Sequence, residues 1–210
     1  MQLNIDKAFE LLGYHDTRQQ KIKNLYNQPH RKYHNIKHIN NMLRWVEPHE
    51  RLHTLLECII YHDLQYTKKV SPPGLNEAMS ISLYMINKLK MFFDSEPSLR
   101  SANIDQEIIS VTEAINATAH HDKDQKHLSF LTQLVLDLDL QSFGQSREEF
   151  LEDSHNIRLE LGDKTFLKGG KKFLQTLLKR KQLFYLKTEW EDQARSNISW
   201  RIKNMKEVPH

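Results

Sequence analysis

Apolar residues recur along most of the chain at intervals of three and four positions, the spacing of one face of an α-helix. Ile36, Ile39 and Leu43, for example, fall on one face of a segment that Pro48 terminates. No stretch shows the strict alternation of apolar and polar residues that indicates a β-strand. The helical spacing is found at 6–14, 16–27, 36–46, 52–60, 76–89, 104–119, 128–140, 147–161, 164–181 and 188–206.

Glycine and proline separate these segments. Loops are expected at 68–74 and at 97–103, and Gly169 with Gly170 interrupts the basic segment at 164–181. The chain contains no internal repeat, and its 210 residues are enough for one large domain. The pattern therefore predicts an all-α fold, a single domain of roughly nine or ten helices that spans the whole chain.

Composition limits the classes of protein that fit. Hydrophobic residues make up 39% of the chain, enough for a core, yet no apolar run approaches the ~20 residues that span a bilayer. The first residues lack the basic and apolar regions of a secretory signal. The one cysteine, Cys58, excludes an internal disulfide framework and is expected to be a small buried side chain. We therefore expect a cytoplasmic protein with no membrane partner.

Charge gives little support to nucleic-acid binding. The net charge is only +3 with neutral histidines. The lysine-rich segment at 164–181 has an ordinary inward side at Leu174, Leu177 and Leu178, so we interpret its lysines as a solvated helix face and nucleic acid as an unlikely partner. Histidine is more informative, because twelve is a high count for this length and several of them fall in one constellation.

That constellation joins histidines and carboxylates from distant segments. His34 and His38 are four residues apart, so their rings lie near one face if Asn35 opens a helix. The later members each follow an apolar helical segment and can approach the same point. Neutral imidazoles and ionised carboxylates are ligands for a divalent cation, and the combination favours a metal site although each part alone is common by chance. The members are His34, His38, His62, Asp63, Asp137 and Asp139.

The arrangement resembles the HD superfamily of metal-dependent phosphohydrolases. The superfamily is defined by a histidine on a helix, then a His-Asp doublet, then a distant aspartate on a later helix. Four residues match these positions: His38, His62, Asp63 and Asp139. Locally, Tyr33-His34-Asn35 with the following His38, and 115–118 with the following His121, are similar to segments of cyclic nucleotide phosphodiesterases. The resemblance implies an HD-type helical bundle.

A closer similarity is to functionally uncharacterised bacterial HD proteins of about this length, and it covers about 26–200. It rests on Pro29-His30-Arg31, Asn76-Glu77, Asp137-Leu138-Asp139-Leu140 with Gly144, and Glu191 with Ala194-Arg195 and Asn197. The chain departs from that family in having Lys171 where an arginine is usual and Leu161 where an aromatic residue is usual. Both departures bear on substrate contacts more than on metal binding.

The resemblance implies that His38, His62, Asp63 and Asp139 hold one divalent cation. Oxygen and nitrogen ligands without a thiolate suit Mn, Mg, Fe, Ni or Zn. The two carboxylate oxygens of Asp63 can also bridge to a second metal. Three residues are candidates to line that second site or to bind phosphate: Glu77, His120 and His121.

The implied chemistry is attack of a metal-activated water on a phosphate ester. Asp63 or Asp137 can accept a proton from the water, and His34 is the candidate acid for the leaving oxygen, by resemblance to phosphodiesterases. Candidate substrate contacts are Arg31, Asn35, Lys37, Asn76, Arg158 and Arg195. For Asn35, helix capping is an equally supported role. For Arg158 and Arg195, ion pairs with Glu160 and Glu191 respectively are slightly favoured over substrate contacts.

We therefore expect a phosphohydrolase acting on a small phosphate ester, with a nucleotide, monoester or cyclic diester, as the expected substrate. One alternative is a metal-containing module that senses a nucleotide without turnover. Another is a di-iron HD-type oxygenase. The oligomeric state is left open. The phosphohydrolase hypothesis requires that the rings of His38 and His62 and the carboxylate of Asp139 converge.

Overall fold

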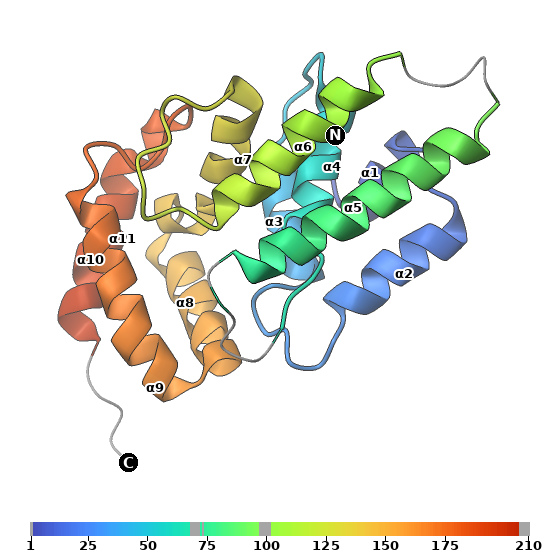
Figure 1. Ribbon diagram of the computed structural model, residues 1–210. Coiled ribbons are helices and arrows are strands. Elements are labelled where there is room, and N and C mark those ends of the chain that lie inside the picture. Colours follow the sequence, from blue (N-terminus) through green and yellow to red (C-terminus); the bar gives the residue numbers. More distant parts are fainter. Residues whose placement is uncertain (1, 68–71, 73, 97–101, 206–210) are drawn as a thin grey trace.

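Every regular element among the described residues is a helix (Figure 1). The structure, a computed structural model, describes residues 2–67, 72, 74–96 and 102–205. The first part of the chain contains α1 (Ile5–Leu11), α2 (Asp16–Tyr26), α3 (Ile36–Leu43), α4 (Leu52–Tyr61), α5 (Leu75–Asp94) and α6 (Ile104–Thr118). The second part contains α7 (Phe130–Asp139), η2 (Gln141–Gly144), α8 (Arg147–Leu161), α9 (Asp163–Thr165), η3 (Phe166–Gly170), α10 (Lys171–Lys179), η4 (Thr188–Trp190) and α11 (Glu191–Asn204).

The predicted all-α, single-domain fold is confirmed, because the described part of the chain has ten α-helices of seven residues or more, and α9 is a single turn. The Gly-Gly pair interrupts the basic segment as predicted, in a π-helical turn, η3, between α9 and α10. The segment predicted at 36–46 ends earlier, at Leu43, and the backbone N–H groups of Trp45 and Val46 bond to carbonyls three residues back. The predicted loops at 68–74 and 97–103 lie mostly outside the described residues.

Short polar side chains fix where several helices begin. Four helices have a side-chain cap that accepts a hydrogen bond from a backbone N–H of the first turn. The caps are Asn4 on α1, Asn35 on α3, Ser129 on α7 and Ser146 on α8. Each cap satisfies a donor that the helix itself leaves unpaired. The cap on α3 matters for the site, because the start of that helix decides which way His38 faces.

Helix α4 lies at the centre of the fold. Its residues from Thr54 to Tyr61 are all buried, and it packs against α1, α3, α5, α6 and α7. A helix that is apolar on all sides is stable only in the interior. Cys58 lies on this helix and is fully buried, as predicted. Because α4 ends inside the protein, the residue after it, His62, is also buried, with 1% of its surface exposed.

The helices fall into two groups along the molecule. In Figure 1, α8, α9, α10 and α11 gather at one end, and α2 and α5 lie at the other. Helix α7 packs on α4 and α6, which belong to the first part of the chain. It is followed directly by η2, which contacts α8 and α11. The end of α7 is therefore placed where the two groups meet.

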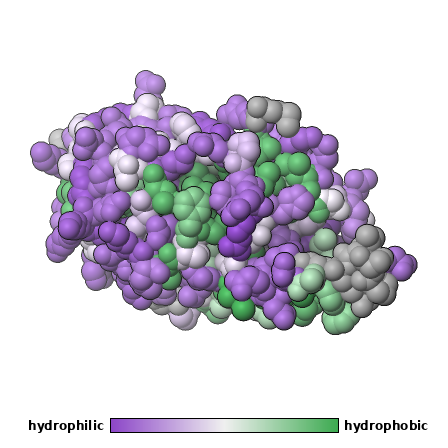
Figure 2. Space-filling model, turned by 90° about the horizontal axis from the view of Figure 1, so that it is seen from above, coloured by the Kyte–Doolittle hydropathy of each residue, from purple (hydrophilic) through white to green (hydrophobic). Residues whose placement is uncertain are grey.

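Some hydrophobic side chains remain on the surface. On α5, Ile86 and Phe93 are 64% and 67% exposed. Figure 2 shows one face of the molecule, which is mostly hydrophilic with hydrophobic residues gathered in patches. Among the helices of the described residues, none combines the length and the apolar character needed to cross a bilayer.

Candidate metal centre

Three helix ends bring the predicted ligands together. His38 lies in the first turn of α3, on its buried side. His62 caps the C-terminal end of α4, with Asp63 next in the chain, and Asp139 is the last residue of α7. Side chains that are up to about one hundred positions apart therefore reach one point in the interior, as the metal-site hypothesis requires.

The nitrogen and oxygen atoms of these side chains face one another at short distances. The Nε2 atoms of His38 and His62 are 3.2 Å apart. Oδ1 of Asp139 lies 3.1 Å from the first Nε2 and 3.6 Å from the second. Oδ2 of Asp63 lies 3.1 Å from Nε2 of His62 and 3.9 Å from that of His38. Ligand atoms of the two histidines and Asp139 all lie within 4.8 Å of one another, a spacing that a single cation can bridge.

The ring of His62 is held in the tautomer that a metal needs. Its Nδ1 lies 2.8 Å from the carbonyl oxygen of Ile59, which can only accept a hydrogen bond. Nδ1 therefore carries the hydrogen, and Nε2 of the neutral ring directs a lone pair into the cluster. Nδ1 of His38 is buried without a partner. The two Nε2 atoms and the nearby carboxylate oxygens form a nitrogen and oxygen donor set, which fits a divalent cation.

The electrostatics of the cluster lead to the same conclusion. Burial alone lowers the pKa of His62, but Asp63 and Asp139 outweigh it and raise that pKa well above its ordinary value. Burial alone raises the pKa of Asp139, but hydrogen bonds, first from His121 and then from His38, bring it well below its ordinary value. The site therefore favours ionised carboxylates with positive charge beside them, which a proton or a divalent cation can supply.

The residues predicted to line a second metal site differ in position. His121 is in direct contact with the cluster, since its Nε2 lies 2.7 Å from Oδ2 of Asp139. The pKa of Glu77 is raised, first by burial and then by the charge of Asp63, which places Glu77 in the electrostatic field of the cluster. His120 instead lines an adjacent groove. The structure thus brings His121 to the cluster, and Glu77 near it.

His34 stands beside the cluster without joining it. Its Nε2 is 3.9 Å from Oδ2 of Asp63, and its ring stacks on that of Tyr66 with the centroids 4.4 Å apart. Its Nδ1 is hydrogen-bonded to Oε1 of Glu160. Burial lowers the pKa of His34, but Asp63 and Glu160 outweigh it, so the pKa is raised above its ordinary value. A raised pKa and an Nε2 that lies beside the cluster suit a proton donor.

Glu160 is the site residue that sequence reasoning missed. It was expected to pair with Arg158, but its carboxylate is buried and accepts the backbone N–H groups of Tyr33 at 2.9 Å and His34 at 3.1 Å, in addition to the His34 ring. Burial raises the pKa of Glu160, but the bond from His34 outweighs it and lowers the pKa to about 2. The carboxylate is therefore ionised and orients the ring of the candidate acid.

Arg31 ties two parts of the site together. Its guanidinium donates to the carbonyl oxygens of Asp63 at 2.7 Å, Leu64 at 2.9 Å and His34 at 3.2 Å, and the residue is only 4% exposed. These bonds hold the turn after α4 against the loop that carries His34. The structure therefore gives Arg31 a structural role in place of the predicted contact with substrate phosphate.

The carboxylate of Asp137 is directed at another part of the chain. Oδ1 accepts the backbone N–H of Tyr185 at 2.8 Å, and Oδ2 accepts those of Leu186 at 2.6 Å and Lys187 at 2.9 Å. Residues two apart on a helix point about 200° apart, so Asp137 cannot face the same way as Asp139. The structure gives Asp137 an anchoring role in place of the predicted catalytic one.

The remaining predicted substrate contacts have partners within the protein. Asn35 caps α3, as its structural alternative proposes. The other pairs are Lys37 with Glu152, Asn76 with the backbone of Thr67, Arg158 with Asp163, and Arg195 with Glu191. None of these five predicted residues is among the described residues that line the cavity beside the cluster.

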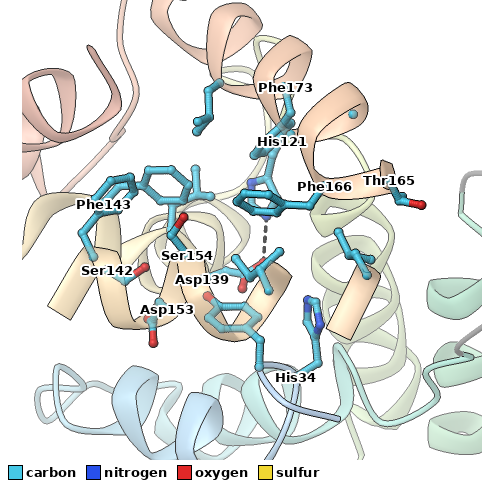
Figure 3. A pocket seen from close by; sticks show the side chains of 18 of the residues that line it. His34, His121, Asp139, Ser142, Phe143, Asp153, Ser154, Thr165, Phe166 and Phe173 are labelled. Carbon is cyan, nitrogen blue, oxygen red and sulfur yellow. Dashed lines mark hydrogen bonds and ion pairs between the residues drawn. The ribbon is translucent and has the colours of Figure 1, made fainter. Parts of the chain in front are cut away.

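That cavity has a volume of about 320 Å³, within the range of small-molecule sites. His34, His121 and Asp139 are among the residues that line it. Figure 3 shows the ring of His34 and the contact between His121 and Asp139 below Phe166 and Phe173. Most of the remaining wall is apolar and includes Leu140, Phe143, Phe150, Phe166, Phe173 and Leu174.

Comparisons of the chain with models of protein families, with curated proteins and with solved structures find no match. The resemblance to HD proteins, which rests on short motifs around His38, His62 and Asp139, therefore stays a prediction. The geometry of the cluster and the character of the cavity next to it are the basis on which a function can be proposed.

Proposed function

We propose that the protein is a metal-dependent phosphohydrolase that acts on a small phosphate ester. The observation that carries the proposal is the pair of buried imidazoles, His38 and His62, whose Nε2 atoms face each other and the carboxylates of Asp63 and Asp139. Of the four proposed ligands, Asp139 lines the neighbouring cavity, so a ligand can approach the cluster from that side. A ligand set that leaves one coordination position open is typical of catalytic rather than structural metal sites.

Four side chains would hold the cation: His38, His62, Asp63 and Asp139. A divalent cation there supplies positive charge that polarises a phosphoryl group and acidifies water. The bond from Nδ1 of His62 to Ile59 fixes the ring that would bind it, which is the usual task of a supporting contact behind a metal ligand. Imidazole and carboxylate ligands suit Mn, Mg, Fe, Ni or Zn.

His34 is the proposed acid. Its Nδ1 is occupied by Glu160, so Nε2 is the ring atom left to face the cavity that the residue lines. The raised pKa keeps the ring protonated to higher pH than a free imidazole. The proton passes to the oxygen of the leaving alcohol as its bond to phosphorus breaks, and water supplies the new oxygen of the phosphate. Of the two predicted proton acceptors, Asp63 lies with the cluster.

Two alternatives have their own signatures. A di-iron oxygenase needs further ligands, and His121, which contacts Asp139, is a candidate for one of them. Two irons per chain with oxygen uptake would support that function. A nucleotide-sensing module would bind a nucleotide in the presence of metal and release no product.

The direct test is hydrolysis by purified protein of p-nitrophenyl phosphate and AMP, measured as phosphate release, and of cyclic AMP, measured as formation of AMP. The protein is stripped with EDTA and reloaded with one divalent metal at a time. We expect turnover that requires metal and that falls about 10²–10⁴-fold in His34→Ala with bound metal unchanged. His155→Ala, at an exposed histidine of α8, is the matched control and should behave as wild type. Metal-loaded protein that hydrolyses no ester would contradict the proposal.

A further inference from the structure

Apart from the imidazoles of His34 and His121, the cavity beside the cluster has no basic side chain among the described residues that line it. Asp139 and Asp153 both line it, whereas neither lysine nor arginine is among the described residues that do so. Asp153 is 7% exposed and hydrogen-bonded to Ser142. Recognition of a polyphosphate uses several cationic side chains, because each phosphate adds negative charge. The described lining offers no lysine or arginine for these charges, so the cavity does not suit the phosphate chain of a nucleoside di- or triphosphate.

The rest of the cavity wall is suited to an apolar group. Four phenylalanines contribute to it from separate elements: Phe143 from η2, Phe150 from α8, Phe166 from η3 and Phe173 from α10. In Figure 3 the ring of Phe166 lies between Phe173 and the space next to His34 and Asp139. Binding of an apolar group to such a wall is favourable because it removes apolar surface from water. The same wall offers few hydrogen-bond partners to the hydroxyl groups of a sugar.

We propose that this cavity binds an uncharged apolar group, aromatic or aliphatic, of the substrate. The preferred substrates would then be phosphate monoesters of apolar alcohols, in preference to nucleotides. This inference rests on the proposed function and narrows it, because the metal cluster would take the phosphate while the cavity takes the alcohol portion. Hydrolysis consumes one water and yields the apolar alcohol and inorganic phosphate.

A neighbouring groove provides the contrast. It has a volume of about 470 Å³, is lined by Lys123 and Lys172, and shares His121, Gly169 and Phe173 with the cavity. A nucleotide held at the cluster would have to place its additional charge in this groove. Lys172→Gln therefore distinguishes the substrate classes. Hydrolysis of an apolar monoester should be unchanged, whereas hydrolysis of a nucleotide that depends on the groove should fall.

Ile157 allows a test with a defined sign. It lines the cavity from α8, so Ile157→Lys adds a cation to the apolar wall. The variant should weaken binding of an apolar group and strengthen binding of an anionic one. Leu159→Lys is the matched control, because the same change is made two residues away at a position that is 56% exposed. Leu161→Lys is a second cavity variant, at a lining position that is 41% exposed and so less demanding on the fold.

The experiment measures kcat/KM with Mn²⁺ for methyl, ethyl, propyl and butyl phosphate, 1-naphthyl phosphate, AMP and ATP. We expect a rise of about fourfold for each added methylene, until the cavity is filled. The kcat/KM for 1-naphthyl phosphate should be at least tenfold higher than for AMP or ATP. Ile157→Lys should abolish this difference in kcat/KM, whereas Leu159→Lys should retain it. Equal or better turnover of AMP or ATP, no dependence on chain length, or no effect of Ile157→Lys and Leu161→Lys would overturn the inference and leave the proposed function standing.

A binding assay decides the inference even if no ester is hydrolysed. The neutral fluorescent probe N-phenyl-1-naphthylamine is titrated into the protein in the presence of EDTA. Binding to wild type and Leu159→Lys that weakens at least tenfold in Ile157→Lys supports an apolar subsite. Absence of binding, or equal binding to all three proteins, refutes it. Failure of every ester would then count against the proposed function alone.

Discussion

The ring of His34 and the carboxylate of Glu160 are hydrogen-bonded to each other across 126 positions of the chain. The second carboxylate oxygen accepts the backbone N–H groups of Tyr33 and His34, so Glu160 holds both the loop and the ring. Its side chain is 1% exposed. Helix α8, which carries Glu160, thereby fixes the direction in which the candidate acid faces the cavity.

Replacing Glu160 with glutamine should change how the stability of the metal-free protein depends on pH. The pKa of Glu160 is lowered from its ordinary 4.5 to about 2, because the bond from His34 outweighs burial. A lowered pKa in the folded state stabilises the protein above pH 4.5, and this stabilisation is lost as the pH falls towards 2. This stabilisation amounts to about 3 kcal/mol, and Glu160→Gln should remove most of it. In urea unfolding, the free energy of unfolding of the variant should fall less steeply as the pH is lowered from 4.5 to 2.

His34 also makes the stability of the folded protein depend on pH, but its contribution decreases as the pH rises. Its pKa is raised, so its stabilisation is present below the ordinary 6.5 and is lost as the pH rises through the raised value. The difference between wild type and Glu160→Gln should therefore be largest where both partners are charged, from about pH 4.5 to 6.5. Glu148→Gln, at an exposed position of α8, is the control. Parallel profiles for wild type and Glu160→Gln would show that the pair contributes no stability.

His62→Ala should abolish metal binding at the cluster. The change removes the Nε2 atom that faces Asp63 at 3.1 Å and His38 at 3.2 Å, and we expect the affinity for Mn²⁺ to fall at least about 100-fold. Calorimetric titration of metal-free protein measures the affinity. Wild type should also gain about 2.7 kcal/mol of stability at metal concentrations 100 times Kd, and the variant should not. Wild-type affinity in His62→Ala would place the metal elsewhere, and His34→Ala serves as the control that keeps the site.

Asp137→Asn should lower stability without affecting metal affinity. Asparagine keeps one acceptor oxygen but turns an NH₂ group towards backbone donors such as those of Leu186 and Lys187. The loss of charge-assisted bonds is expected to cost about 2–4 kcal/mol in urea unfolding. A variant as stable as wild type that no longer binds Mn²⁺ would contradict the anchoring role of Asp137.

The helices could be predicted because their signals are local, and the meeting of His38, His62 and Asp139 was expected from their motifs. The three-and-four spacing of apolar residues reports the buried side of each helix, and the His62-Asp63 doublet follows an apolar helix directly. The different roles of Asp137 and Asp139 could not be predicted from the residues around them. They depend on the backbone of Leu186, which meets α7 from 49 positions away.

Glu160 illustrates what the sequence indicates only in part. Asp153, Ile157 and Glu160 are spaced to lie on one side of α8, and Asp153 and Glu160 are both buried. A buried carboxylate needs a partner, so two of them on an inward side were a usable signal. The identity of the partner, His34, could not be read from the chain because the contact is formed only when α8 packs against the loop before α3.

The apolar cavity was not foreseen, and it changes the expected substrate. Its walls come from α7, η2, α8, η3 and α10, and no single segment carries a pattern that distinguishes a cavity wall from a core position. The resemblance to phosphodiesterases favoured a nucleotide, while the described lining lacks the cations that a nucleotide phosphate chain needs. Substrate class therefore depends on the packing of the second half of the chain.

Gly144 and Gly169 should respond differently to replacement by alanine. A Cβ at Gly144 would lie 2.4 Å from Cβ of Trp190, so Gly144→Ala forces η2 away from η4 and should cost about 1–3 kcal/mol. At Gly169 nothing lies within 4 Å of a Cβ, and Gly169→Ala should be neutral or stabilise by up to about 1 kcal/mol. Urea unfolding measures both. Because Trp190 packs on Trp45, Gly144→Ala should also shift tryptophan emission. Equal midpoints for the two variants would contradict the close packing of η2 on η4.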